Sequence, residues 1–145
     1  MPGVRILRVL SGRLFEGGEE TLLKECSKLV AVAFEANAAL KSLTTGTPDT
    51  ASMRGLERKA DQEKFRIANL ITSGAVAPNV LDNMLVLLGQ QDNIVNSIYN
   101  VSRELHRYKI RDEEKDRHLR ESVIEISNLV DAALTRCSRC MRRET

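Results

Sequence analysis

The 145-residue sequence has few aromatic residues: three Phe, two Tyr and no Trp. Its 22 basic and 20 acidic side chains nearly cancel, which leaves a net charge of +2. Surfaces that bind nucleic acid combine a basic field with aromatic side chains on which the bases stack. The composition therefore predicts no nucleic-acid partner.

Long apolar runs are also absent. Arg5, Arg8 and Arg13 interrupt the apolar residues near the N-terminus, so no signal-peptide core is recognised there. The apolar run at 80–88 is much shorter than the roughly 20 residues of a membrane span. We expect a soluble protein with no direct membrane insertion.

Cysteine is scarce as well, and the odd count of three does not indicate a disulfide framework, so we expect a cytoplasmic location. Cys137 and Cys140 form an i, i+3 pair that could be redox-active or half of a zinc site. Neither a second CxxC nor a histidine pair completes such a site, because His106 and His118 lie twelve positions apart. We expect both thiols to act as small apolar residues instead.

Motifs for catalysis are missing too. The sequence contains neither the G-x-S-x-G of many hydrolases nor the Gly-Lys-Ser/Thr of a phosphate-binding loop. We expect a protein that is not an enzyme.

Turn-forming residues fall between four segments with helical periodicity. Helices are predicted at 19–43, at 52–72 and from Pro78 to about residue 108, and a fourth follows the charged cluster 111–116, capped by Asp112 or Asp116. No segment alternates as a strand does. The fold class is therefore all-α, an elongated antiparallel bundle of about four long helices at 19–145. Residues 1–18 form an N-terminal arm, with the first 15 or so either a short helix or extended.

Each predicted helix carries one apolar stripe. The residues expected in the core are Leu22, Cys26, Leu29, Ala33, Ala36 and Leu40; Met53, Leu56, Ala60, Ile67 and Ile71; and Val80, Met84, Leu87, Leu88, Ile94, Val95, Ile98, Val101 and Leu105. In the fourth helix Leu119, Val123, Ile126, Val130, Ala133, Cys137 and Cys140 form a heptad-like seam. This seam predicts antiparallel packing or a homo-oligomer.

Two polar pairs are candidate metal ligands. Glu57 and Asp61 are four positions apart on the second predicted helix, so their carboxylates project side by side and could share a hard cation. Asp92 and Asn96 have the same spacing on the third, and antiparallel neighbours would bring the two pairs together. The alternative is a solvated face on which the acids form weak surface ion pairs.

The stretch LERKADQEK at 56–64, followed by a break and then APNVLDNMLVLLGQQDNIVNSIYNVSREL, resembles the PhoU-like family, in particular its shorter branch of phosphate transport regulators. Leu56, Glu57, Ala60 and Asp61 match a Leu-Glu-x-x-Ala-Asp pattern, and residues 91–96 correspond to an acidic pattern on the next helix. The opening GRLFEGGEETLLKECSKLVAVAFEANAAL also resembles the start of that family.

The resemblance implies an all-helical fold and a regulatory or adaptor role beside a phosphate permease or its regulatory proteins. It also implies multivalent metal ions such as iron, zinc, nickel or manganese at Glu57, Asp61, Asp92 and Asn96. Lys59, Asn96 and Tyr99 depart from the acidic pattern and remove negative charge from that site. The alternative is a helical protein-interaction scaffold with no metal or phosphate role; a third reading is a hydrolase or a redox enzyme that uses Cys137 and Cys140.

Overall fold

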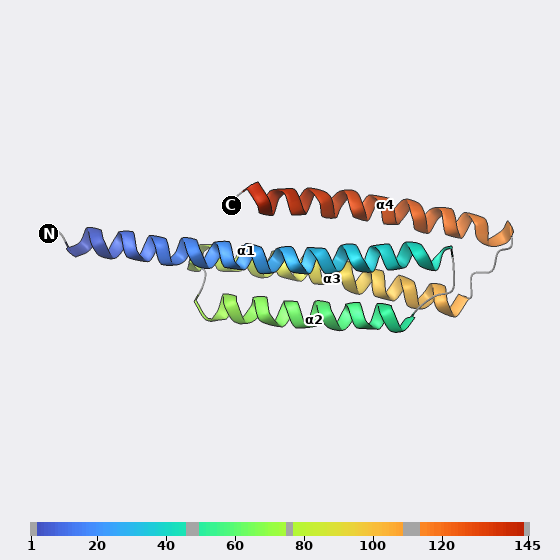
Figure 1. Cartoon of the computed structure of the whole chain (residues 1–145), viewed down its shortest axis with the longest axis horizontal. Coiled ribbons are helices and arrows are strands. Elements are labelled where there is room, and N and C mark those ends of the chain that lie inside the picture. The colour runs from blue at the N-terminus through green and yellow to red at the C-terminus, as the bar shows by residue number, and fades with distance from the viewer. Residues whose placement is uncertain (1–2, 46–49, 75–76, 109–113, 144–145) are drawn as a thin grey trace.

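Four long helices run lengthwise beside one another in the computed structural model, which describes residues 3–45, 50–74, 77–108 and 114–143 (Figure 1). They are α1 (Gly3–Leu43), α2 (Thr50–Thr72), α3 (Pro78–Tyr108) and α4 (Glu114–Arg143). The described residues form no strand. The all-α helical bundle predicted from the sequence is confirmed.

Helix α1 is the longest element, with 41 residues and a length of about 60 Å. The sequence left open whether the first 15 or so residues form a helix or an extended arm; the backbone is helical from Gly3 onward. The N-terminal part of α1 extends past the ends of the other three helices (Figure 1). The predicted arm is thus a continuation of α1.

The breaks between helices have clear local causes. The backbone N–H and the hydroxyl of Thr44 both donate to the carbonyl oxygen of Lys41, at 3.1 and 2.6 Å, after α1 ends. Beyond the end of α2, Gly74 has a φ of 84°, a left-handed conformation that favours glycine because it lacks a Cβ. Pro78 opens α3, where its missing N–H costs no helical hydrogen bond.

The start of α4 differs from the prediction in detail. Glu114 and Asp116 both lie in its first turn, where carboxylates interact favourably with the positive end of the helix dipole. Asp116 is therefore inside the helix, and Asp112, the other candidate cap, falls outside the described residues.

The core follows the predicted stripes on the first three helices, except that Val101 is 43% exposed and Leu56, Met84, Leu87 and Ile94 are only half-buried. All six residues predicted for α1 are buried, as are Met53, Ala60, Ile67 and Ile71 on α2 and Leu88, Val95, Ile98 and Leu105 on α3. Helix α1 packs against each of the other three helices, and α2 packs against α3. The bundle is thus organised around α1.

The predicted seam of α4 is wrong in part. Val123 is buried as expected, whereas Ile126 is 56% exposed and Ala133 and Cys140 are also exposed. Leu134 and Met141 take the core positions instead. At these three positions of the seam the buried residue is the next one along the chain, and at the first of them it is the polar Ser127.

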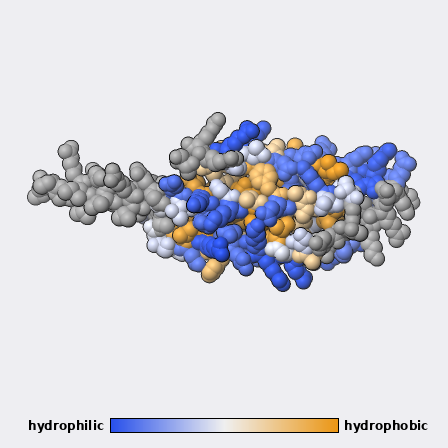
Figure 2. Space-filling model, viewed as in Figure 1, coloured by the Kyte–Doolittle hydropathy of each residue, from blue (hydrophilic) through white to orange (hydrophobic). Residues whose placement is uncertain are grey.

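None of the described helices has an apolar stretch long enough to cross a membrane. On the face shown in Figure 2, hydrophobic residues are visible between hydrophilic ones along the middle of the bundle.

Candidate functional site

The four residues predicted to bind metal lie on α2 and α3, which pack against each other. Asp92 is 6% exposed. Asn96 and Glu57 are half-buried, and Asp61 is exposed. The quartet therefore straddles the edge of the α2/α3 interface.

Asp92 already has two polar partners. Its Oδ2 accepts a hydrogen bond from Lys64 Nζ at 2.6 Å and another from Asn96 Nδ2 at 3.1 Å. The structure thus brings Asp92 and Asn96 together, as predicted, but places an ammonium beside the carboxylate. A cation that bound Asp92 through Oδ2 would have to displace the ammonium of Lys64 or tolerate its repulsion.

The other two predicted ligands are not drawn into this contact. Among the described residues, no hydrogen bond or ion pair involves the side chain of Glu57 or Asp61. Lys59, which lies between them, instead pairs with Glu35 of α1, with Nζ at 2.9 and 3.0 Å from the two carboxylate oxygens.

Within the described part of the chain, no group of three or more His, Cys, Asp or Glu side chains has a metal-binding arrangement. The geometry around Asp92 fits an interhelical ion pair better than a multivalent cation. Metal binding at this site stays a prediction. The ion pair shows that it depends on Lys64 as well as on the four predicted ligands.

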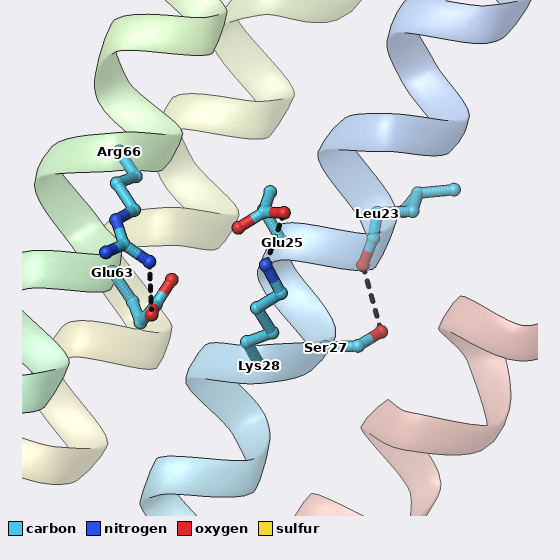
Figure 3. Close-up of polar contacts among 6 residues, drawn as sticks. All are labelled: Leu23, Glu25, Ser27, Lys28, Glu63 and Arg66. Atoms are coloured by element: carbon cyan, nitrogen blue, oxygen red, sulfur yellow. Dashed lines mark hydrogen bonds and ion pairs between the residues drawn. The ribbon is translucent and has the colours of Figure 1, made fainter.

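A second set of charges lies between α1 and α2 (Figure 3). Lys28 Nζ is 2.6 Å from Glu25 Oε1 on α1, and Arg66 Nη1 is 3.1 Å from Glu63 Oε1 on α2. Both are i, i+3 pairs within one helix, and Figure 3 shows them facing each other. In the described part of the chain the buried Oε2 of Glu63 has no hydrogen-bond partner. Because each carboxylate has a cation of its own, this cluster stabilises helices rather than forming a ligand site.

A polar cluster joins α1 to α4. The fully buried Asn37 donates from Nδ2 to the backbone carbonyl oxygen of Ser127 and to Asp131 Oδ1, both at 2.7 Å. Lys41 Nζ contacts Asp131 Oδ2. Burial acts to raise the pKa of Asp131, but the hydrogen bonds from Lys41 and Asn37 outweigh it and hold the pKa below its usual value. These contacts fix how α4 is rotated against α1.

The three thiols have different environments, and all are free. Cys26 is buried; burial first, and then the nearby Cys137 and Glu25, raise its pKa to about 11. Cys137 is half-buried, with its Sγ 3.9 Å from Gln91 Nε2. Cys140 is exposed, so the expectation that both members of the CxxC pair pack as apolar residues holds only for Cys137.

An open apolar groove runs between α3 and α4 and has a volume of about 1080 Å³. We call it the α3–α4 groove; its apolar lining residues are Val101, Leu105 and Tyr108 from α3 and Leu119, Val123 and Ile126 from α4. The groove exists because, among the described residues, the backbone of α4 approaches α1 but no other helix. Three of the lining side chains, Val101, Tyr108 and Ile126, are exposed.

A second hollow, of about 570 Å³, lies between the first half of α2 and the last part of α3. We call it the arginine pocket; the side chains that define it are Arg54, Arg58, Tyr99, Arg103, His106 and Arg107. Sequence reasoning missed it, although a signal was present. Arg54 and Arg58 are one helical turn apart, and so are Tyr99, Arg103 and Arg107.

Comparison with known proteins identifies no relative of this chain. No protein-family model matches the chain, and no curated protein or solved structure matches it.

Proposed function

We propose that this protein is a non-enzymatic helical adaptor, whose α3–α4 groove binds an amphipathic helix of a partner protein. The observation that carries the proposal is the groove itself, an apolar channel between two helices that a third helix would fill.

The exposure of the groove residues supports this role. Val101 is 43% exposed, Ile126 56% and Tyr108 65%, although all three belong to one channel. Isolated apolar residues on a surface are ordinary, whereas a continuous apolar patch is typical of an interaction site. Covering these side chains would remove apolar surface from water and stabilise the complex.

The rim of the groove suits a helix with one apolar face. Arg107 and Glu104, both on α3, pair along one edge at 2.8 Å, and His118 and Ser122 line the α4 side. An amphipathic helix would place its apolar stripe inside and its polar flanks against this rim. A second copy of the chain could supply such a helix through the exposed Ile126 and Leu129 of α4, which would make the protein a homo-oligomer.

The resemblance to the PhoU-like family supports a narrower proposal, regulation of phosphate transport. The partner would then be a phosphate permease or one of its regulatory proteins, and the protein would act in the cytoplasm beside the transporter. The support is the match at Leu56, Glu57, Ala60 and Asp61 and the correspondence at residues 91–96 of α3.

Two substitutions on α3 test the groove. Val101→Asp places a charge inside it, whereas Leu85→Asp places the same charge on a side chain of nearly equal exposure, 42%, that does not line it. The two positions are about 160° apart around the helix. Phosphate uptake is measured in a deletion strain of the source organism that carries the parent gene or either variant, and sedimentation velocity gives the oligomeric state of each purified protein.

We expect Leu85→Asp to restore normal uptake and Val101→Asp to fail. An unchanged uptake after deletion would refute the phosphate role, and full complementation by Val101→Asp would refute the groove. If the parent is a dimer and only Val101→Asp dissociates it, the helix in the groove belongs to a second copy of this chain and not to another protein.

A further inference from the structure

The arginine pocket concentrates positive charge without matching negative charge. Its lining includes four arginines and one histidine and no carboxylate. Arg107 pairs with Glu104 at 2.8 Å, but among the described residues no carboxylate forms an ion pair with Arg54, Arg58 or Arg103. Three guanidinium groups thus share one hollow without counter-charges from the described residues.

This clustering does not follow from the overall composition. Acidic and basic residues are nearly balanced along the chain, so most arginines could have acidic neighbours. Like charges gathered in a concave surface repel one another and raise the local positive potential. An anion bound among them would relieve that repulsion.

The helix dipoles explain only part of the cluster. His106 and Arg107 lie in the last turn of α3, where cations interact favourably with the negative helix end. Arg54 lies in the second turn of α2, close to the positive end, where a cation has no such benefit. The helix dipoles therefore do not explain the position of the arginines on α2, whereas a bound anion would.

The walls of the pocket are held in place by the core. Met53 at its floor is 2% exposed, and Ser102, also 2% exposed, donates from Oγ to the carbonyl oxygen of Tyr99 at 2.7 Å. The guanidinium carbon of Arg103 lies 5.6 Å from the centre of the Tyr99 ring, so a cation–π contact orients it. The helix walls and Arg103 are thus ordered before an anion binds, whereas the exposed side chains of Arg54 and Arg58 would be ordered by the anion itself.

We propose that the arginine pocket binds a small anion that carries two or more phosphoryl groups. Guanidinium groups present paired N–H donors that match the oxygens of a phosphoryl group, and each such pair is charge-assisted. Several guanidinium groups around one hollow call for an anion with more charge than a single orthophosphate. A volume of about 570 Å³ is within the usual range for small-molecule sites. This proposal does not depend on the α3–α4 groove or on a role in phosphate transport.

Isothermal titration calorimetry of the full chain tests the proposal with orthophosphate, pyrophosphate, tripolyphosphate, sulfate and ATP as probes. The test variant is Arg54→Gln with Arg103→Gln. The matched control, Arg136→Gln with Arg139→Gln, removes two exposed arginines of α4 and therefore the same net charge. Circular dichroism melting shows whether each variant is folded.

We expect the parent and the control to bind tripolyphosphate equally well. In the test variant the affinity should fall by about tenfold to a hundredfold for each lost pairing of a guanidinium with a phosphoryl group. Pyrophosphate should bind at least about tenfold more tightly than orthophosphate or sulfate, because it can engage more guanidinium groups. Tighter binding of ATP than of tripolyphosphate would assign the site to a nucleotide, and the reverse order to an inorganic oligophosphate.

Three results would overturn the proposal. One is that the parent gives no heat of binding at millimolar tripolyphosphate. Another is that the test and control variants lose equal affinity for tripolyphosphate, which would show an effect of net charge and not of a specific site. The third is equal affinity for orthophosphate and pyrophosphate. If the test variant is unfolded, Arg58→Lys provides the same comparison, since it keeps the charge but loses the paired donors.

Discussion

The side-chain amide of Asn37 on α1 donates a hydrogen bond to the backbone carbonyl oxygen of Ser127 on α4, at 2.7 Å. The two residues are 90 positions apart in the sequence, and both are fully buried. A buried polar contact of this kind discriminates between rotations of α4, because an unmade hydrogen bond in the interior is costly.

Replacing Asn37 should therefore weaken the bundle strongly. Asn37→Ala removes the hydrogen bonds to Ser127 and Asp131 and leaves a cavity, so we expect the free energy of unfolding to fall by about 2–4 kcal/mol. Urea denaturation measures the change. Asn93→Ala, at an exposed position of α3, is the control and should be nearly neutral. A loss for Asn37→Ala no larger than that of the control would contradict the role of this contact.

The carboxylate of Asp131 should make stability depend on acidity. Its pKa is lower in the folded protein than in the unfolded chain, so the unfolded state takes up the proton first as the pH falls. The stabilisation is complete above the unfolded pKa and is lost as the pH drops through the folded pKa. We expect Asp131→Asn to show a smaller difference in unfolding free energy between neutral pH and about pH 3 than the parent. Asp82→Asn, an exposed aspartate of α3, should keep the dependence of the parent; identical curves for all three proteins would rule out this contribution.

Two glycines should respond to alanine in opposite directions. Gly89 lies inside α3, and a Cβ there would meet no atom within 4 Å, so Gly89→Ala should stabilise by about 0.5–1 kcal/mol. Gly74 has equally open space but a φ of 84°, so Gly74→Ala should destabilise by a similar amount. Thermal denaturation compares the two variants with the parent. A change of the same sign at both sites would show that helix propensity and backbone strain do not decide the outcome.

The thiols should react in the order of their exposure. The thiolate is the reactive form, and a buried thiol with a pKa of about 11 forms little of it near pH 8. We expect iodoacetamide to modify the exposed Cys140 first and Cys26 last, as followed by mass spectrometry of the peptides. Denaturant should remove the difference. Equal rates at Cys26 and Cys140 in the native protein would show that the core around Cys26 opens readily.

The ammonium of Lys64 should compete with any cation at the predicted metal ligands. Lys64→Ala removes this competitor from Asp92, so binding of Mn²⁺ or Zn²⁺ should tighten, and Asp92→Asn should weaken it. Equilibrium dialysis with metal analysis gives both affinities, with Lys28→Ala as a control that breaks only the pair with Glu25 on α1. No bound metal in the parent or in Lys64→Ala would remove the site formed by Glu57, Asp61, Asp92 and Asn96.

The sequence predicted the helices well because their core residues are apolar and evenly spaced. Leu22, Leu29 and Ile67 were all expected in the core, and each has no exposed surface. The pattern misled for α4, where Ile126 is apolar but exposed and Ser127 is polar but buried. Apolar periodicity cannot show that a buried position is held by a hydrogen bond to another helix.

The candidate site was less predictable. Spacing correctly placed Asp92 and Asn96 side by side, since that relationship lies within one helix. The contact of Lys64 with Asp92 depends on the register between α2 and α3, which spacing within each helix does not fix. The arginine pocket depends on the same register, because Arg54 and Arg103 face one hollow from different helices.

Helix α4 should resist local unfolding less than the unit formed by α1, α2 and α3, because of the way it is attached. Helices α1, α2 and α3 each pack against two or more neighbours, whereas the described backbone of α4 packs against α1 alone. Detaching α4 would break its interface with α1 and side-chain contacts with α3 such as that of Cys137 with Gln91, and would leave the other three helix interfaces intact. Its amide hydrogens should therefore exchange with solvent faster than those of α2 and α3, through a partial unfolding that the rest of the bundle survives.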